Sequence, residues 1–261
     1  MNYLTSSQAS SLLGISNDTL RRWDKKGQLK PNKIDKKTSY RYYKEENINN
    51  YLKSLDIFKL AFIWAKNKKV KEPQKIFYCN NISFLNYKLT KLENELMKIN
   101  EFKESYSLLT SMVGEIGINS FDHNLGNWPD ISGIFFAYNI KNRTIVLADR
   151  GQGILKTLSR VKPDIKNDQE ALNIAFTEII SGRAPESRGN GLKYVKRIIT
   201  KTDNFSLKFY SGTAELFLKH QDKNLKIKTK KDKIKGCLAL RDRLIKCVWQ
   251  LFARSIFRPF F

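Results

Sequence analysis

Residues 16–29 read SNDTLRRWDKKGQL, and this stretch decides the fold of the N-terminal region. Ser16 is a residue type that caps helix N-termini, and Gly27 is one that ends helices. Between them, Leu20 and Trp23 lie three residues apart and therefore share one face of a helix. The stretch predicts a short helix that turns its apolar face inward and its basic side chains outward.

A second helix is predicted just before this one. Ala9, Leu12 and Leu13 recur at helical spacing, and Gly14 follows where the helix should end. Two helices joined by a tight turn that contains glycine form the helix-turn-helix motif. The second helix of such a motif presents polar side chains to the DNA major groove, here Asn17, Arg21 and Arg22.

The following segment, residues 29–43, alternates in character and is rich in lysine. Such alternation predicts a β-hairpin wing. Its lysines would lie on DNA phosphates: Lys33, Lys36 and Lys37. Residues 45–55 then predict a short helix.

Residues 1–55 are expected to form a DNA-binding domain, and about the first 50 of them resemble the MerR and excisionase-like winged helix-turn-helix family. The resemblance is carried by Thr19–Trp23, Gly27, Leu29, Pro31 and Tyr40–Tyr42. It implies binding to double-stranded DNA, usually as a homodimer on a palindrome. It also implies that Arg21 and Arg22 contact bases or phosphates, and that Arg41 and Tyr42 contact the DNA backbone. The alternative is a small helical protein-interaction module with a solvated basic face.

Charge supports a polyanionic partner. The 261 residues include 48 Lys and Arg and 25 Asp and Glu, a net charge of +23, which indicates nucleic acid or an anionic membrane. The excess is densest at the two ends, with +6 in residues 1–55 and +9 in residues 220–261. Three cysteines without metal-like spacing argue against a zinc finger or a disulfide scaffold. Because no apolar signal core opens the sequence and no run of 18 apolar residues occurs, we expect a cytoplasmic protein.

The middle of the chain predicts a linker and a long helix. Residues 56–72 begin apolar and become strongly basic before Pro73, which predicts a linker between two domains. Residues 75–79 predict a short strand. From Asn86 to Leu109 apolar residues recur every three or four positions, which predicts one amphipathic helix. It could form a dimeric coiled coil or cover a sheet, and its short heptad pattern favours the sheet.

Residues 113–124, VGEIGINSFDHN, carry the first of three polar constellations. On one helix Glu115, Asn119, Asp122 and His123 would share a face. An amide oxygen such as that of Asn119 can bind a hard cation, and a carboxylate such as that of Glu115 can orient a water. This pairing is typical of a magnesium–phosphate site.

The other two constellations contain glycine. Residues 145–155, IVLADRGQGIL, predict a strand that ends in Asp149, and the glycines after it would let the backbone approach a ligand. Residues 180–199, ISGRAPESRGNGLKYVKRII, predict a loop that opens a helix, where backbone N–H groups favour phosphate. The spacing fits neither a Walker A loop nor a Rossmann loop.

In this order, the three stretches resemble the N box and the two glycine boxes of the GHKL ATP-binding fold. That superfamily includes gyrase-type topoisomerases, Hsp90, MutL-type repair proteins and sensor histidine kinases. The resemblance covers about residues 73–240. It implies an α+β chain: a winged helix-turn-helix, then a GHKL (Bergerat) α/β sandwich with a mixed sheet covered by helices on one face. Residues 241–261 would form a basic amphipathic tail.

The resemblance implies ATP and Mg²⁺ as cofactors. Asn119 would coordinate Mg²⁺, Asp149 would bond the adenine amino group, and Glu115 would be the general base in a hydrolysing member. The other residues implied to bind ATP are Asp122, Gly151, Gly153, Arg188, Gly189 and Gly191. Residues 155–188 would be a mobile lid over the nucleotide.

A later strand of this fold often carries Gly-Thr near the adenine. Residues 211–213 (Ser-Gly-Thr) and 235–237 (Lys-Gly-Cys) compete for that place, and the second puts cysteine where threonine is expected. The two histidines, His123 and His220, do not lie on a separate dimerisation helix, so we do not expect an autophosphorylating histidine kinase.

The sequence therefore predicts a DNA-binding regulator whose second domain binds Mg-ATP, with or without hydrolysis, to control binding of DNA or a protein partner. Two alternatives stay open: a serine/threonine-type protein kinase of the anti-sigma class that acts on an unknown protein partner, and a nucleotide-dead DNA-binding adaptor. The tail could lie on an anionic membrane surface, dock a partner helix or pack on its own domain, and we favour the last.

Overall fold

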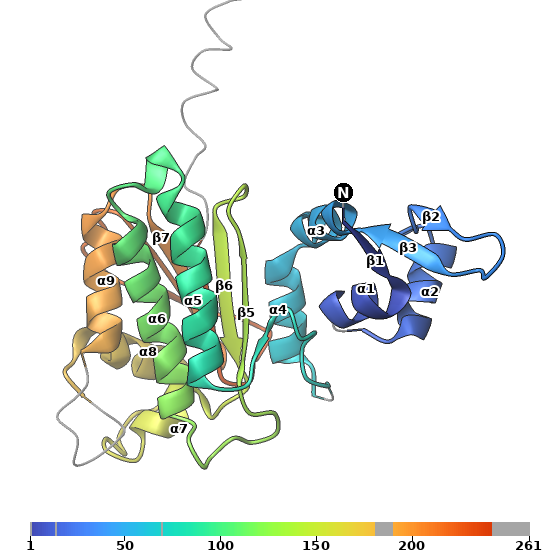
Figure 1. Ribbon diagram of the computed structural model, residues 1–261. Coiled ribbons are helices and arrows are strands. Elements are labelled where there is room, and N and C mark those ends of the chain that lie inside the picture. The colour runs from blue at the N-terminus through green and yellow to red at the C-terminus, as the bar shows by residue number, and fades with distance from the viewer. Residues whose placement is uncertain (1, 14, 69, 181–189, 242–261) are drawn as a thin grey trace, which may run out of the picture.

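The computed structural model describes residues 2–13, 15–68, 70–180 and 190–241. They form an N-terminal part of short helices with a small sheet, and a larger part in which helices cover a long sheet (Figure 1). Helix α4, Ile57–Lys66, lies between the two parts. The predicted α+β class is confirmed.

The N-terminal part has the predicted helix-turn-helix, hairpin and third helix. Its elements are β1 (Tyr3–Thr5), α1 (Ser6–Leu13), α2 (Asn17–Lys25), β2 (Lys33–Ile34), β3 (Arg41–Lys44) and α3 (Glu45–Ser54). Ser16 caps α2, because its hydroxyl accepts a hydrogen bond from the backbone N–H of Thr19 at 3.1 Å. Strand β1 was not predicted, and it pairs with β3 to give the antiparallel order β1-β3-β2.

A small core holds the N-terminal part together. Its buried members are Ala9, Leu13, Leu20, Leu29, Tyr43 and Ile48. Trp23 is half-buried, and its ring lies 5.2 Å from that of Tyr51 on α3. Leu20 and Trp23 therefore serve packing, as their spacing predicts.

Helix α4 belongs to the core of the larger part. Asp56 caps its start by accepting a hydrogen bond from the N–H of Lys59 at 2.9 Å. Ile57, Ala61 and Trp64 are buried against one face of the long sheet. The segment predicted as a linker over residues 56–72 thus contains a packed helix, although the division of the chain into domains stays a prediction.

The long sheet has the order β4-β5-β6-β10-β7-β8-β9. Its strands are β4 (Tyr78–Cys79), β5 (Ile134–Asn139), β6 (Thr144–Asp149), β7 (Ser206–Ser211), β8 (Ala214–Lys219), β9 (Lys226–Thr229) and β10 (Cys237–Arg241). Every strand pair that the structure describes in it is antiparallel, so the predicted mixed sheet is wrong. The reason is that β5–β6 and β7–β8 are hairpins with short turns, while β10 returns between β6 and β7.

The two faces of this sheet pack against different helices. Ile134 and Phe136 of β5 lie in the cluster under the helices of one face, whereas Phe135 and Ala137 lie in the cluster with α4 on the other. This alternation follows the two-residue period of a strand. A sheet covered on one face only was predicted, so the position of α4 on the second face corrects that expectation.

The first face carries α5 (Ile82–Met97), α6 (Tyr106–Asp122), α8 (Asp168–Thr177) and α9 (Gly191–Lys201), and α5, α6 and α9 run side by side in Figure 1. The short elements η1 (Asn100–Phe102) and α7 (Gly153–Leu158) complete the described helices. The single helix predicted from Asn86 to Leu109 is wrong, because the chain turns at η1. Phe102 in that turn is itself buried, so the apolar periodicity continues across the break.

The C-terminal predictions are met in part. The alternation in residues 224–230, NLKIKTK, predicts a solvated strand or hairpin, and β9 lies there. The predicted tail begins at Arg241, which is the last residue of β10, and its remaining residues lie outside the described part of the chain. No helix among the described residues is long and apolar enough to cross a membrane.

Candidate DNA-binding surface and ligand pocket

The exposed side of α2 carries the arginines that the sequence assigned to DNA. The Arg21 side chain is 64% exposed and lies 3.7 Å from the carboxylate of Asp18. Arg22 is also exposed, and it donates a hydrogen bond to the hydroxyl of Thr19 at 3.0 Å. Asn17 is exposed too, but its side-chain oxygen accepts a hydrogen bond from Ser10 at 2.9 Å, which joins α1 to α2.

The tip of the β2–β3 hairpin presents exposed lysines on a preformed turn. The Asp35 carboxylate accepts hydrogen bonds from the backbone N–H groups of Thr38 and Lys37, both at 2.9 Å. These hydrogen bonds, that of Thr38 most of all, lower the pKa of Asp35. Lys36 and Lys37 therefore stand on a turn whose backbone is held in place, as a phosphate-contacting wing requires.

Arg41 forms an ion pair within the protein. Its Nε donates to Asp24 Oδ2 at 3.1 Å, and the two side chains are 32% and 21% exposed. This pair joins β3 to α2 and so fixes the angle between the wing and the helix. Neighbouring Tyr42 is half-buried on the strand face opposite the buried Tyr43. Contacts of Arg41 and Tyr42 with DNA stay predictions.

A cavity of about 590 Å³ opens between α6, the end of β6 and the start of α9. Its volume is in the range of small-molecule and cofactor sites. It brings together six residues that the sequence predicted from three separate stretches: Glu115, Asn119, Asp122, Asp149, Gly153 and Gly191. Predicted Arg188 and Gly189 lie outside the described residues.

One end of the pocket joins polar side chains of α6 to the first residue of α9. Asn119 Nδ2 donates to Glu115 Oε1 at 3.3 Å, which leaves the Asn119 carbonyl oxygen for a ligand. A Cβ added at Gly191 would lie 1.9 Å from Glu115 Oε1 and 2.8 Å from Asn119 Nδ2. Glycine therefore lets the N-terminal end of α9, whose first backbone N–H groups have no partner within the helix, come this close to both side chains without displacing them.

The other end of the pocket is built around Asp149, which is 2% exposed. Its carboxylate accepts hydrogen bonds from the Ser120 hydroxyl at 3.0 Å and from the Gly151 N–H at 2.8 Å. Burial raises the pKa of Asp149 to about 6, because desolvation outweighs these hydrogen bonds. A ligand N–H that reached this carboxylate would stabilise its charged form.

The strand that closes this end is the one with cysteine. Gly236 has φ +60°, and a Cβ there would lie 2.1 Å from Asp149 Oδ1. The next residue, Cys237, lines the pocket, and burial raises the pKa of its thiol. The competing Thr213 instead donates its N–H and its hydroxyl to Asp168, both at 2.9 Å. Residues 235–237 thus occupy the place beside Asp149.

Several lining residues were missed by the sequence analysis. Ser120 and Asn124 each directly follow a residue of the predicted polar helix face, Asn119 and His123. The side-chain oxygen of Asn124 accepts a hydrogen bond from the Gln152 N–H at 2.8 Å. A Cβ at Gly151 would lie 2.0 Å from Asn124 Nδ2, so Gly151 makes room for this side chain. Helix α6 ends at Asp122, so helical spacing no longer predicts which way the side chains after it point.

The lid predicted over residues 155–188 is wrong for most of its length. Helices α7 and α8 occupy much of it, and Leu172 and Phe176 of α8 are fully buried in the core. Asp168 at the start of α8 accepts hydrogen bonds from Thr213 in the turn between β7 and β8. These residues form part of the packed layer beside the pocket, and residues 181–189 lie outside the described part of the chain.

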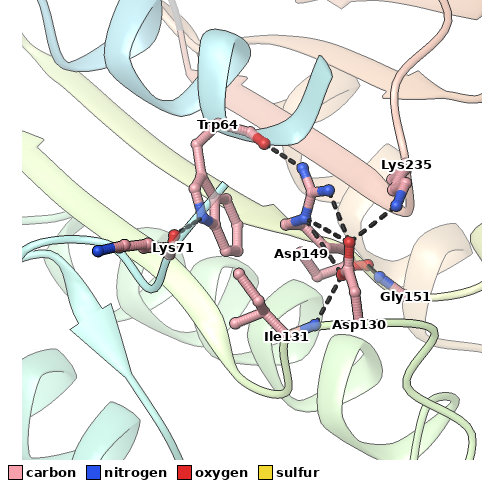
Figure 2. A network of polar contacts seen from close by, with 8 residues as sticks. Trp64, Lys71, Asp130, Ile131, Asp149, Gly151 and Lys235 are labelled. Carbon is pink, nitrogen blue, oxygen red and sulfur yellow. Dashed lines mark hydrogen bonds and ion pairs between the residues drawn. The ribbon is translucent and has the colours of Figure 1, made fainter. Parts of the chain in front are cut away.

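A buried arginine lies behind the pocket, on the α4 side of the sheet. Arg150 is fully buried and donates to Asp130 at 2.7 and 3.2 Å and to the backbone carbonyl of Trp64. Lys235 reaches the same carboxylate at 2.8 Å (Figure 2). Partial burial would raise the pKa of Asp130, but the hydrogen bonds from Arg150 and Lys235 hold it well below its usual range. We call Arg150, Asp130, Lys235 and the Trp64 carbonyl the Arg150 cluster.

Known proteins are similar to parts of this chain. A stretch of 64 residues is 40% identical to an Escherichia coli protein named Type II methyltransferase M.Eco47II, and it covers 24% of this chain and 15% of that protein. Residues 4–52 match the family described as MerR HTH family regulatory protein. These residues span α1, α2, the wing and most of α3. They are a MerR-family helix-turn-helix domain, which indicates a DNA-binding regulator.

Proposed function

We propose that this chain is a DNA-binding regulator whose larger part binds Mg-ATP and thereby controls its affinity for DNA. The observation that carries the nucleotide half of the proposal is the pocket itself. Three stretches that resemble the GHKL boxes contribute Asn119, Asp149 and Gly191 to one cavity of about 590 Å³. A chance resemblance of three short motifs would not require their side chains to meet.

The two ends of the pocket suit the two ends of a nucleotide. The buried carboxylate of Asp149 is an acceptor for an exocyclic amino group, as the adenine ring offers. The N-terminal N–H groups of α9, beside Asn119, are donors for phosphate oxygens. Base and phosphates would therefore lie at opposite ends of the same cavity.

The metal would enter with the nucleotide. No group of three or more His, Cys, Asp or Glu side chains that could hold a metal ion occurs among the described residues. Asn119 would supply one oxygen ligand, and phosphate oxygens and water would supply the others, which is a usual arrangement for Mg²⁺. Glu115, hydrogen-bonded to Asn119, would orient a water toward the terminal phosphate, and hydrolysis is proposed through this residue.

On the DNA side, the proposal assigns the base and phosphate contacts to Arg21 and Arg22 and the wing contacts to Lys36 and Lys37. Their exposure supports this assignment. A homodimer on a palindromic site is part of the proposal, since regulators with this type of domain commonly bind in that form.

The test is a DNA titration with and without nucleotide. A duplex is first selected from a random library by the full chain, and its affinity is then measured by fluorescence anisotropy with and without millimolar Mg-ATP. We expect the two affinities to differ in the unmodified chain and to coincide in the Asp149→Asn variant. Equal affinities in the unmodified chain, together with no binding of labelled ATP, would favour the nucleotide-dead adaptor.

A further inference from the structure

The pocket lies far from the predicted DNA-contacting surface. Figure 1 shows α2 and the β2–β3 hairpin on the side of the N-terminal part that faces away from the long sheet. Helix α4 lies between the sheet and α3. An element that contacts both parts could therefore carry an effect of pocket occupancy to the DNA-contacting surface, and among the described residues α4 is in that position.

The end of α4 is attached to the two backbone segments that form the Asp149 end of the pocket. Arg150, which donates to the carbonyl of Trp64, lies between Asp149 and Gly151 in the sequence. Lys235 directly precedes Gly236, and its backbone N–H donates a hydrogen bond to the carbonyl of Ala65 at 3.0 Å. Figure 2 shows Trp64, Lys235 and Asp149 gathered near Asp130.

These hydrogen bonds give partners to backbone carbonyls at the end of α4 that have none within the helix. The last carbonyls of a helix have no partner within it, and cations stabilise its C-terminal end. Trp64 and Ala65 lie in the last turn of α4, and the Arg150 guanidinium also lies 5.7 Å from the centre of the Trp64 ring. A shift of Arg150 or Lys235 would therefore change the partners of the end of α4.

Little room separates the pocket from these attachments. A Cβ at Gly236 would lie 2.6 Å from both the Asp149 carbonyl oxygen and the Gly151 N–H nitrogen. The two segments are thus in direct backbone contact. A ligand that fixes Asp149 and Cys237 would also restrict Arg150 and Lys235. Arg150 directly follows Asp149, and Lys235 lies two residues before Cys237.

The other end of α4 is attached to the helix-turn-helix domain. Leu52 of α3 packs both against the N-terminal core and against the cluster that contains Ile57 and Ala61 of α4. Leu55, between the two helices, packs against the same α4 cluster. A continuous set of packed groups therefore runs from the pocket through α4 to α3.

We infer that α4 transmits pocket occupancy to the helix-turn-helix domain, and that Arg150 is the positioning residue that joins α4 to the pocket. The inference rests on the proposed function, because it requires the pocket to bind Mg-ATP. Arg150 acts through α4 and the Asp149 segment, and it does not line the pocket.

The test is hydrogen exchange on the full chain, followed by mass spectrometry, with and without millimolar Mg-ATP. In the unmodified chain we expect slower exchange in peptides that cover residues 145–158, which report on binding. We also expect exchange of residues 57–66 to slow by about fivefold or more, the lower end of typical coupling factors. In Arg150→Met, the pocket peptides should still respond, while residues 57–66 should not.

A matched control is Arg143→Met. Arg143 directly precedes β6 and pairs with Glu101, whereas Arg150 directly follows β6, so this variant removes an arginine ion pair at the opposite end of the strand without touching α4. It should behave as the unmodified chain does. Should Arg150→Met fail to fold, insertion of Gly-Gly-Ser between Leu55 and Asp56 gives a second test. With the insertion, residues 57–66 should still respond to Mg-ATP, and the response of residues 45–54 that we expect in the unmodified chain should be lost.

The outcomes separate the two proposals. Slower exchange in the pocket peptides without any change in residues 57–66 would overturn this inference and leave ATP binding intact. A response of residues 57–66 that survives in a folded Arg150→Met variant, or a response of residues 45–54 that survives the insertion, would overturn it as well. No change in any peptide would overturn ATP binding, and the inference with it.

Discussion

The buried carboxylate of Asp149 should make the stability of this protein depend on pH in a specific way. Burial raises its pKa from the ordinary 3.8 to about 6. Between these two values the folded chain holds the proton more tightly than the unfolded chain, so folding stability falls as pH rises from about 4 to 6. A shift of this size corresponds to about 3 kcal/mol. Asp149→Asn removes the titrating group and should remove this loss.

The assay is urea unfolding followed by tryptophan fluorescence, for the unmodified chain and Asp149→Asn, at pH 4 and pH 7. Relative to the unmodified chain, the variant should be more stable at pH 7 than at pH 4 by about 3 kcal/mol. Asp130→Asn is a control that should not show this difference. Because the pKa of Asp130 is lowered, its stabilising contribution is present above the ordinary value of 3.8 and is lost only as pH falls below it, so that variant should be destabilised by nearly the same amount at pH 4 and at pH 7. An Asp149→Asn difference that is the same at both pH values would refute the argument.

Three further predictions concern single side chains. Arg22→Ala should weaken binding to the selected duplex by about 1–3 kcal/mol, measured by anisotropy, whereas Lys103→Ala, which removes an exposed charge far from α2, should leave the affinity nearly unchanged. Gly236→Ala should lower the free energy of unfolding in urea by more than Gly126→Ala does, since both have positive φ but only Gly236 has Asp149 within 2.1 Å of the added Cβ; equal losses would contradict this. Glu115→Gln should retain labelled ATP and abolish phosphate release, and unchanged turnover would reject Glu115 as the base.

The N-terminal part could be predicted almost completely from the sequence. Caps, glycine turns and the Leu20–Trp23 spacing are local signals, and each acts within a few residues. Strand β1 was missed because three residues, Tyr3–Thr5, show no periodicity. The pairing of Arg41 with Asp24 could not be found either, since it depends on how the wing folds back onto α2.

In the larger part, the ends of elements were predictable where polar residues follow an apolar run. Asp149 at the end of β6 is such a case. The break between α5 and α6 was not, because the buried turn around Phe102 continues the helical pattern. The antiparallel direction of the sheet and the packing of α4 depend on contacts between distant residues, which one sequence does not reveal.

In the pocket, too, local spacing was predictable and contacts between distant segments were not. Glu115 and Asn119 were predictable from their spacing on one helix, whereas Ser120 and Asn124 required the direction of β6 relative to α6. Arg150 was passed over although it directly follows Asp149. Alternation along a strand sends neighbouring side chains to opposite faces, so this arginine had to lie on the face opposite the pocket.

The central claim is that the cavity beside Asp149 binds Mg-ATP, and isothermal titration of the full chain tests it most directly. We expect one Mg-ATP to bind per chain and Asp149→Asn to lose most of the affinity, while Arg143→Met binds as the unmodified chain does. Absence of binding at millimolar Mg-ATP, or equal binding by a folded Asp149→Asn variant, would contradict it.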